Sequence, residues 1–201
     1  ARAHLAGSPI LFAANHVAWW DALLLLPLDE ALGGEWRALM DAANLKRLPF
    51  FGWVGAVPLD RASPARAREG LKQAAAHLSA PGNALWIFPQ GKQRPAWIRP
   101  LQLRRGVQLL GRLTRAPIVP VSIQYGFREQ STPSVVVDFG PLLPHDASLE
   151  AIEAGLCDGL ARIDDFFLDQ SSRYAPLIAP RGGRSEDSLG SRLLTMNRRT
   201  T

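Results

Sequence analysis

The chain has 201 residues and a net charge of +5, and 47% of its residues are hydrophobic while 20% are charged. This composition is typical of one globular domain with a sizeable core, and it excludes an intrinsically disordered chain. The single cysteine, Cys157, excludes an internal disulfide and a metal site built on several thiolates. The lack of an Asn-x-Ser/Thr acceptor, together with this cysteine usage, favours a cytoplasmic setting.

The sequence predicts neither a membrane span nor a secretory signal. Residues 3–20 lack Lys, Arg, Asp and Glu, but they contain His, Asn, Gly and Pro and therefore fail as a transmembrane helix. The chain begins with Ala1 rather than Met, and we expect it to be a fragment or a trimmed product. A membrane anchor ahead of Ala1 stays an open alternative.

Positive charge is concentrated in the middle of the chain. Residues 61–115 hold eleven Lys and Arg against one acid, whereas residues 116–170 hold two Arg against nine acids. Such a basic segment indicates an anionic partner, for example a phosphate, a cofactor, a lipid headgroup or a nucleic acid. Alternatively, the cations lie on solvated helix faces. No nucleic-acid partner is expected, because zinc-finger spacing and an aromatic RNA-binding pattern are both missing.

The first predicted elements alternate between strand and helix. Residues 9–15 are apolar and predict a short buried strand. Residues 21–32 predict a helix that Pro27 kinks or splits. A second strand is expected at residues 36–40, followed by a short helical turn at residues 42–46.

An aromatic loop is expected next, at residues 49–53. Residues 56–60 predict a strand that Pro58 confines to a sheet edge or a strand end. The serine at position 63, followed by proline, is a typical helix start and predicts a helix over residues 64–78.

The second half of the chain repeats the alternation. Residues 84–88 predict a fully apolar strand, and residues 101–114 predict an amphipathic helix. Two strands rich in Val and Ile are expected at residues 117–123 and 134–139, and a last long helix at residues 146–169.

Alternating strands and helices predict an α/β protein, with a single layered domain in which helices flank a mixed β-sheet. We place this domain at residues 1–175 and a flexible C-terminal tail at residues 176–201, which are rich in Gly, Arg and Ser. Ligands of such folds bind at the carboxyl ends of the strands. Polar residues that directly follow a predicted strand are therefore the candidate site residues.

His16 and Asp21 follow the first predicted strand. A histidine can accept a proton from a hydroxyl near neutral pH, and a nearby carboxylate can fix its tautomer. Five residues correspond to about 500° of rotation on a helix, so the pair would not share a helix face. The two side chains can meet only if His16 lies in the strand-to-helix turn and Asp21 in the first helical turn. Alternatively, Asp21 is a helix cap and His16 is an ordinary hydrogen-bonded residue.

Cations follow two further predicted strands. Arg61 lies at the end of one strand, and Lys92 and Arg94 lie in the turn that follows another. Arg61 and Lys92 are suited to bind phosphate, and an arginine can do so through two parallel hydrogen bonds. Pro117 and Pro120, taken individually, favour loop or edge-strand structure.

The order and spacing of these stretches resemble the glycerolipid acyltransferases, whose best-known members are the 1-acyl-sn-glycerol-3-phosphate (lysophosphatidic acid) acyltransferases. That family has four sequence blocks: Asn-His-x4-Asp, a Gly and an Arg at a strand end, Phe-Pro-Glu-Gly, and an apolar block with a central Pro. The blocks are matched in this order by Asn15, His16 and Asp21, by Gly55 and Arg61, by Phe88, Pro89, Gln90 and Gly91, and by residues 117–121.

The resemblance implies a mixed α/β acyltransferase in which His16 is the general base and Asp21 orients it. It implies acyl-CoA or acyl carrier protein as donor, a lipid hydroxyl as acceptor, and a peripheral position on the cytoplasmic face of a membrane. We expect direct transfer without a cofactor, a metal or an acyl-enzyme. The residues expected to bind substrate are Asn15, Gly55, Arg61, Pro89, Gln90, Gly91, Lys92 and Arg94.

The third block departs from the family pattern. Gln90 replaces the family's glutamate, and Gln93 stands where the family has an arginine. The family uses this block to hold the acceptor, and glutamine keeps hydrogen-bonding capacity without the charge. A lysophospholipid or a glycolipid hydroxyl are therefore alternative acceptors. A lipid-binding protein without turnover is a further alternative, against which the intact His16 and Asp21 argue.

Several aromatic residues surround these blocks. We expect some of them to face an acyl chain or a bilayer, namely Trp19, Trp20, Phe50, Phe51 and Trp53. Trp86 lies within an apolar strand and is expected in the core. Trp97 lies between two arginines and is a candidate for an interfacial anchor beside anionic lipid.

Overall fold

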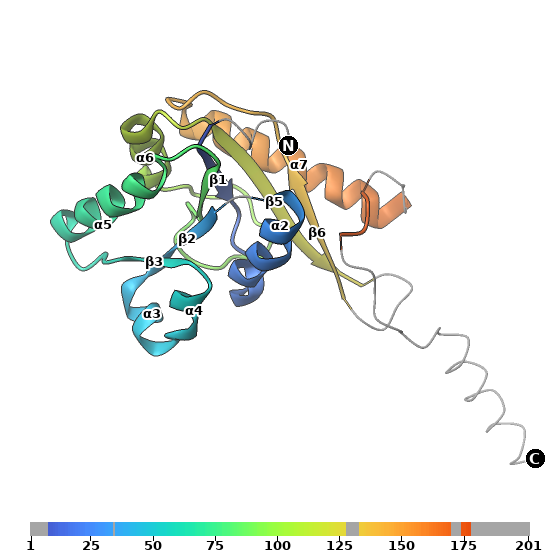
Figure 1. Ribbon diagram of the computed structural model, residues 1–201. Helices are drawn as coiled ribbons and strands as arrows, with labels where there is room; N and C mark the ends of the chain where they lie inside the picture. Colours follow the sequence, from blue (N-terminus) through green and yellow to red (C-terminus); the bar gives the residue numbers. More distant parts are fainter. Residues whose placement is uncertain (1–7, 34, 128–132, 170–173, 178–201) are drawn as a thin grey trace, which may run out of the picture.

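The computed structural model (Figure 1) describes residues 8–33, 35–127, 133–169 and 174–177. The predicted C-terminal tail, apart from residues 176 and 177, lies outside the described residues. The elements are, in chain order, β1 (Ile10–Ala14), η1 (Trp19–Leu24), α2 (Leu25–Leu32), β2 (Glu35–Asp41), α3 (Ala42–Arg47), α4 (Phe50–Trp53), β3 (Ala56–Leu59), α5 (Pro64–His77), β4 (Asn83–Ile87), α6 (Gly106–Thr114), β5 (Ile118–Gly126), β6 (Ser134–Phe139) and α7 (Leu149–Asp169).

The strands form one six-stranded mixed sheet in the order β3-β2-β4-β1-β5-β6. Strands β1 to β5 run parallel to one another, and β6 pairs antiparallel with β5. Strand β1 lies between β4 and β5 and is buried along its whole length, as its unbroken apolar sequence predicts. The predicted α/β class and mixed sheet are confirmed, and so is the edge position of β3.

Helices cover both faces of the sheet (Figure 1). On one face, α5, α6 and α7 pack their apolar side chains against Leu11, Leu85 and Ile87. On the other face, α2 packs against a core that contains Phe12 and Trp86, whose ring centroids lie 5.0 Å apart. Trp86 is fully buried, which confirms its predicted place in the core.

The long helix α7 lies directly on β5, because small residues face the strand. A Cβ atom on Gly159 would lie 2.3 Å from Ser122 Oγ, so the helix approaches the strand more closely than any side chain would allow. Ser122 uses this proximity to donate a hydrogen bond to the Leu156 carbonyl, at 2.8 Å. The packing of α7 fixes the position of β5, and the carboxyl end of β5 carries Tyr125.

Two predicted elements differ from the structure. The helix expected from residue 101 begins at Gly106, because Gln102 adopts a φ of 59° and Arg104 donates its N–H to the Pro89 carbonyl. Val107 and Leu110 of α6 are buried, whereas Leu113 is exposed. The aromatic loop expected at residues 49–53 is helical at α4, which lays Phe51 into the core.

Pro120 lies in an inner strand rather than in the loop or edge strand that was predicted. It occupies β5, opposite Ala13 of β1. Its missing N–H faces away from β1, towards the segment where β6 has already ended, and its carbonyl accepts the Gly140 N–H at 2.8 Å. Pro120 therefore lies at the point where the regular pairing of β5 with β6 ends, and a proline is accommodated inside the sheet there.

Pro27 does not break the first helix. The segment divides two residues earlier, where the 3₁₀ helix η1 passes into α2. Pro27 then occupies the first turn of α2, where backbone N–H groups have no partner within the helix. The backbone of η1, which follows the His16 turn, is wound more tightly than the α-helix α2 that continues it.

Candidate active site

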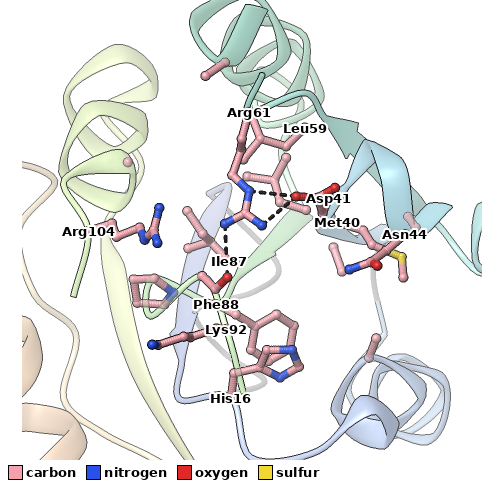
Figure 2. Close-up of a pocket in the computed structure, with 18 of the residues that line it drawn as sticks. His16, Met40, Asp41, Asn44, Leu59, Arg61, Ile87, Phe88, Lys92 and Arg104 are labelled. Carbon is pink, nitrogen blue, oxygen red and sulfur yellow. Dashed lines mark hydrogen bonds and ion pairs between the residues drawn. The ribbon is translucent and has the colours of Figure 1, made fainter. Parts of the chain in front are cut away.

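A cavity of about 730 Å³ lies at the carboxyl ends of β1 to β4 (Figure 2). Each of these parallel strands contributes to its wall: His16 follows β1, Asp41 ends β2, Arg61 follows β3, and the segment from Phe88 follows β4. Residues at the ends of four parallel strands thus lie around one cavity.

His16 and Asp21 are in contact, and the two residues lie in the turn and in the first helical turn, as this contact requires. His16 Nδ1 lies 2.7 Å from Asp21 Oδ2, with His16 in the turn after β1 and Asp21 in the 3₁₀ helix η1. Asp21 is fully buried, while the His16 side chain is 21% exposed and lines the cavity. Asp21 Oδ2 also accepts the N–H groups of Val17 and Ala18, at 2.7 and 3.0 Å, so the aspartate is a cap and a histidine partner at once.

The strand before His16 is tied to its neighbour by Asn15. The buried Asn15 side chain accepts the Ile123 N–H at 2.7 Å and donates to the Ile123 carbonyl at 2.9 Å. The Asn15 N–H also donates to the Val121 carbonyl at 3.3 Å, so the backbone and the side chain of Asn15 together extend the pairing of β1 with β5 beyond Ala14. Asn15 therefore fixes the point at which the His16 turn begins.

The turn after β4 holds His16 from the other side. The buried Gln90 side chain accepts the His16 N–H through Oε1 at 2.6 Å, and the Arg94 N–H donates to the His16 carbonyl at 2.8 Å. The Phe88 ring stacks on the imidazole with a centroid distance of 4.5 Å. Both polar backbone groups of His16 and one face of its ring are thus fixed by residues 88–94, the segment that follows β4.

Arg61 bridges two parts of the cavity wall (Figure 2). Its Nε and Nη2 atoms donate to Asp41 Oδ2 at 2.8 and 2.5 Å, and its Nη1 atom donates to the Gly91 carbonyl at 3.0 Å. The hydrogen bond from Arg61, together with its positive charge, lowers the pKa of Asp41. The guanidinium charge is therefore already balanced by a carboxylate of the protein.

Lys92 and Arg104 also line the cavity, and neither forms an ion pair within the described parts of the chain. Gly91 has a φ of 66°, and a Cβ atom there would lie 2.9 Å from Arg104 Nε and 3.1 Å from Arg61 Nη1. The positive φ favours a glycine at this position, and the two arginine side chains lie directly against it. In Figure 2, Arg104 and Lys92 lie on the side of the cavity opposite Asp41.

The residues predicted to bind substrate divide into two groups. Arg61, Pro89, Gly91 and Lys92 line the cavity together with His16. Four others lie outside its lining and make contacts within the fold, namely Asn15, Gly55, Gln90 and Arg94. Of these, Gly55 has a φ of 89° and lies so close to β2 that a Cβ atom would be 2.9 Å from the Trp36 carbonyl oxygen.

The structure also brings residues to the site that the sequence did not single out. Asp41 ends β2 just as His16 follows β1, so the strand-end argument could have found it. Arg104 had no such signal, because the segment before α6 was expected to be helical. Tyr125 donates its hydroxyl to Asp21 Oδ1 at 2.7 Å and lies 104 residues away from it in sequence.

In the described residues, no group of three or more His, Cys, Asp or Glu side chains is placed to hold a metal ion. Among the helices described, none has the length and apolar character that a membrane crossing requires.

The fold and the site together define an α/β protein with a His-Asp pair at the carboxyl ends of parallel strands. The family model described as Acyltransferase matches residues 2–124, which is more than half of the chain and includes all four sequence blocks. The chain therefore belongs to the Acyltransferase family, the family of the glycerolipid acyltransferases. A comparison with curated proteins finds no match.

The Asp41–Arg61 pair is expected to stabilise the fold in a pH-dependent way. Because the folded pKa of Asp41 is lowered, the contribution is complete above the pKa of an unfolded aspartate, about 4, and is lost as the pH falls through the lower folded value. A double-mutant cycle with Asp41→Asn and Arg61→Gln, measured by urea unfolding, should give a coupling of up to about 1 kcal/mol at pH 7.

The more exposed Asp60–Arg66 pair, at 3.1 Å, is the matched control and should show a smaller coupling. An Asp41–Arg61 coupling that is absent at pH 7, or that persists unchanged at pH 2, would contradict the assignment.

Proposed function

We propose that this acyltransferase moves a fatty acyl group from the thioester of acyl-CoA or acyl carrier protein to a hydroxyl of a lipid acceptor, with His16 as general base. The observation that carries the proposal is the 2.7 Å contact between His16 Nδ1 and the buried Asp21, at the wall of a cavity. A carboxylate accepts only, so Nδ1 carries the proton and Nε2 has the free electron pair.

The transfer follows from this tautomer. His16 Nε2 takes the proton of the acceptor hydroxyl while the oxygen attacks the thioester carbonyl carbon. The tetrahedral intermediate then collapses, the carbon–sulfur bond breaks, and the leaving thiolate takes the proton back from Nε2. Asp21 stabilises the imidazolium that exists between these two proton transfers. The products are an ester and a free thiol, and His16 returns to its starting state.

The cavity wall contains both apolar and cationic side chains. Much of its wall is aliphatic or aromatic, with Leu39, Met40, Leu48, Phe51 and Leu59 among the lining residues, and such a surface suits an acyl chain.

We further propose that Lys92 and Arg104 bind an anionic group of the acceptor or the donor. Both side chains line the cavity, and no acidic partner within the described residues balances their charges. Arg61 is less suited to this role than the sequence suggested, because Asp41 already occupies its Nε and Nη2 atoms.

We also propose a peripheral position at a membrane surface, with exposed aromatic side chains as the contact. Trp53 is 90% exposed, and Trp19 and Trp20 stack on each other with a centroid distance of 3.9 Å while about half of each is exposed. Trp19 also lines the cavity, and so does the buried Phe51 of α4, the short helix that carries Trp53. A lipid acceptor could then enter from the bilayer without crossing water.

The catalytic assignment is tested by replacing His16. Incubation with labelled acyl-CoA and a lipid extract should give an acyl lipid, and His16→Ala should lower the rate by about a hundredfold to ten-thousandfold. His77→Ala is the control, since His77 Nε2 bonds the Glu35 carbonyl at 3.0 Å, outside the cavity lining, and its loss should leave the rate unchanged. Donor binding without any product would show a binding protein, and full activity of His16→Ala would exclude the proposed base.

The anion site is tested with two acceptors, one bearing a phosphate and one a neutral glycolipid. Arg104→Gln should raise the KM for the phosphate-bearing acceptor by about ten- to a hundredfold, because a charge-assisted hydrogen bond is lost, and should leave the neutral acceptor unaffected. Arg112→Gln, on the exposed side of α6, should change neither value. An equal effect of Arg104→Gln on both acceptors would disprove an acceptor site and indicate the donor's phosphates instead.

Membrane contact is tested by liposome binding. Trp53→Ser should weaken binding to anionic vesicles by about tenfold, because a large apolar side chain no longer enters the interface. Leu168→Ser is the control, since Leu168 is 80% exposed but lies on α7. Binding should also weaken as the salt concentration rises. Equal binding of wild type and Trp53→Ser would disprove this contact surface.

A further inference from the structure

Tyr125 lies at the far end of β5, one residue beyond the segment that matches the family model. Its hydroxyl donates to Asp21 Oδ1 at 2.7 Å. The other carboxylate oxygen, Oδ2, receives His16 Nδ1 and the N–H groups of Val17 and Ala18. Tyr125 is thus the side chain that holds the oxygen of Asp21 that His16 does not use.

We propose that Tyr125 is a positioning residue for the His16–Asp21 pair, which sets the orientation of the buried carboxylate and the pH at which the pair takes up a proton. The proposal rests on the proposed function, in which His16 is the base. A fully buried carboxylate with one unpaired oxygen would bind a proton more readily or rotate away from the imidazole. Tyr125 prevents both outcomes.

The sign of the effect follows from the charge of the pair. With a neutral imidazole the pair carries one negative charge, and after protonation it carries none. The Tyr125 hydroxyl dipole points at the carboxylate and favours the pair with a net negative charge over the neutral pair, so it lowers the pH at which the pair is protonated. Desolvation and the contact with Asp21 raise the pKa of Tyr125, which keeps the hydroxyl protonated as a donor.

The pair has few other partners that could act in this way. The charged side chains on neighbouring elements or across the cavity are Asp29 and Glu30 on α2, Asp41, Arg47, Arg61, Lys92, Arg94 and Arg104. Among the described residues, none of these makes a hydrogen bond to the His16 ring or to the Asp21 carboxylate. Their charges act equally in wild type and in a Tyr125 variant.

The chain provides a matched control, because it has two tyrosines and the second also donates to an aspartate. Tyr174 donates its hydroxyl to Asp138 Oδ2 at 2.6 Å, next to the Arg162 ion pair and away from the cavity. Tyr125→Phe and Tyr174→Phe each remove one tyrosine–aspartate hydrogen bond. A general loss of stability would affect both variants alike.

The test follows the ring signals of His16 by NMR across pH, and in parallel the pH dependence of kcat/KM. Tyr125→Phe should move the midpoint of the His16 titration and the acidic limb of the rate profile up by about one pH unit, which corresponds to a tenfold change in the protonation equilibrium. Tyr174→Phe should move neither. In an Asp21→Asn background, Tyr125→Phe should no longer shift the midpoint.

A second measurement keeps the tyrosine in place. In the Tyr174→Phe background, fluorotyrosine can be incorporated at position 125 alone, and it should move the His16 midpoint down, because a more acidic phenol donates a stronger hydrogen bond. This variant decides the matter if Tyr125→Phe fails to fold. An unchanged midpoint in both Tyr125 forms, or an equal shift in Tyr174→Phe, would overturn the proposal. A protein without acyl transfer at any pH would refute the proposed function, while the ring titration would still decide the role of Tyr125.

Discussion

The arrangement of the site depends on one buried carboxylate. Asp21 has no exposed surface, and a charge in such a place is tolerated only when it is fully hydrogen-bonded. Its four partners are the N–H groups of Val17 and Ala18, the imidazole of His16 and the hydroxyl of Tyr125. The same carboxylate therefore starts η1, orients the candidate base and links that turn to β5. The hydrogen bonds that make the buried Asp21 carboxylate tolerable are thus the same bonds that shape the turn and orient the imidazole.

The sheet order explains why distant sequence blocks meet at His16. Strand β1 has β4 on one side and β5 on the other, so the turns that leave their carboxyl ends are neighbours in space. Gln90 and Arg94 bind the His16 backbone across more than seventy residues of sequence, and Asn15 binds Ile123 across 108. A site built in this way inherits the rigidity of the sheet, which is what a general base requires for accurate placement.

The sequence alone predicted much of this fold, for identifiable physical reasons. Apolar runs placed the six strands, and the spacing of His16 and Asp21 allowed a contact only across a strand-to-helix turn, which is where the two side chains meet. The prediction from the sequence failed where tertiary contacts override local preference. Arg104 donates its N–H to the Pro89 carbonyl instead of starting a helix. Pro120 lies inside the sheet, at the point where β6 ends beside it. Tyr125 was not predicted because β5 extends three residues further than its apolar run indicated.

Gln90 has a different part in the site from the one its sequence block suggested. Its side chain is buried and accepts the His16 N–H, so it acts on the backbone of the candidate base and does not reach the cavity lining. A neutral amide can accept this hydrogen bond without adding a second negative charge near Asp21, whereas a glutamate would add one. With glutamine in place of the family's glutamate, the surroundings of His16 and Asp21 therefore carry one negative charge fewer. Recognition of an anionic acceptor would then depend on Lys92 and Arg104, whose charges no acidic side chain among the described residues balances.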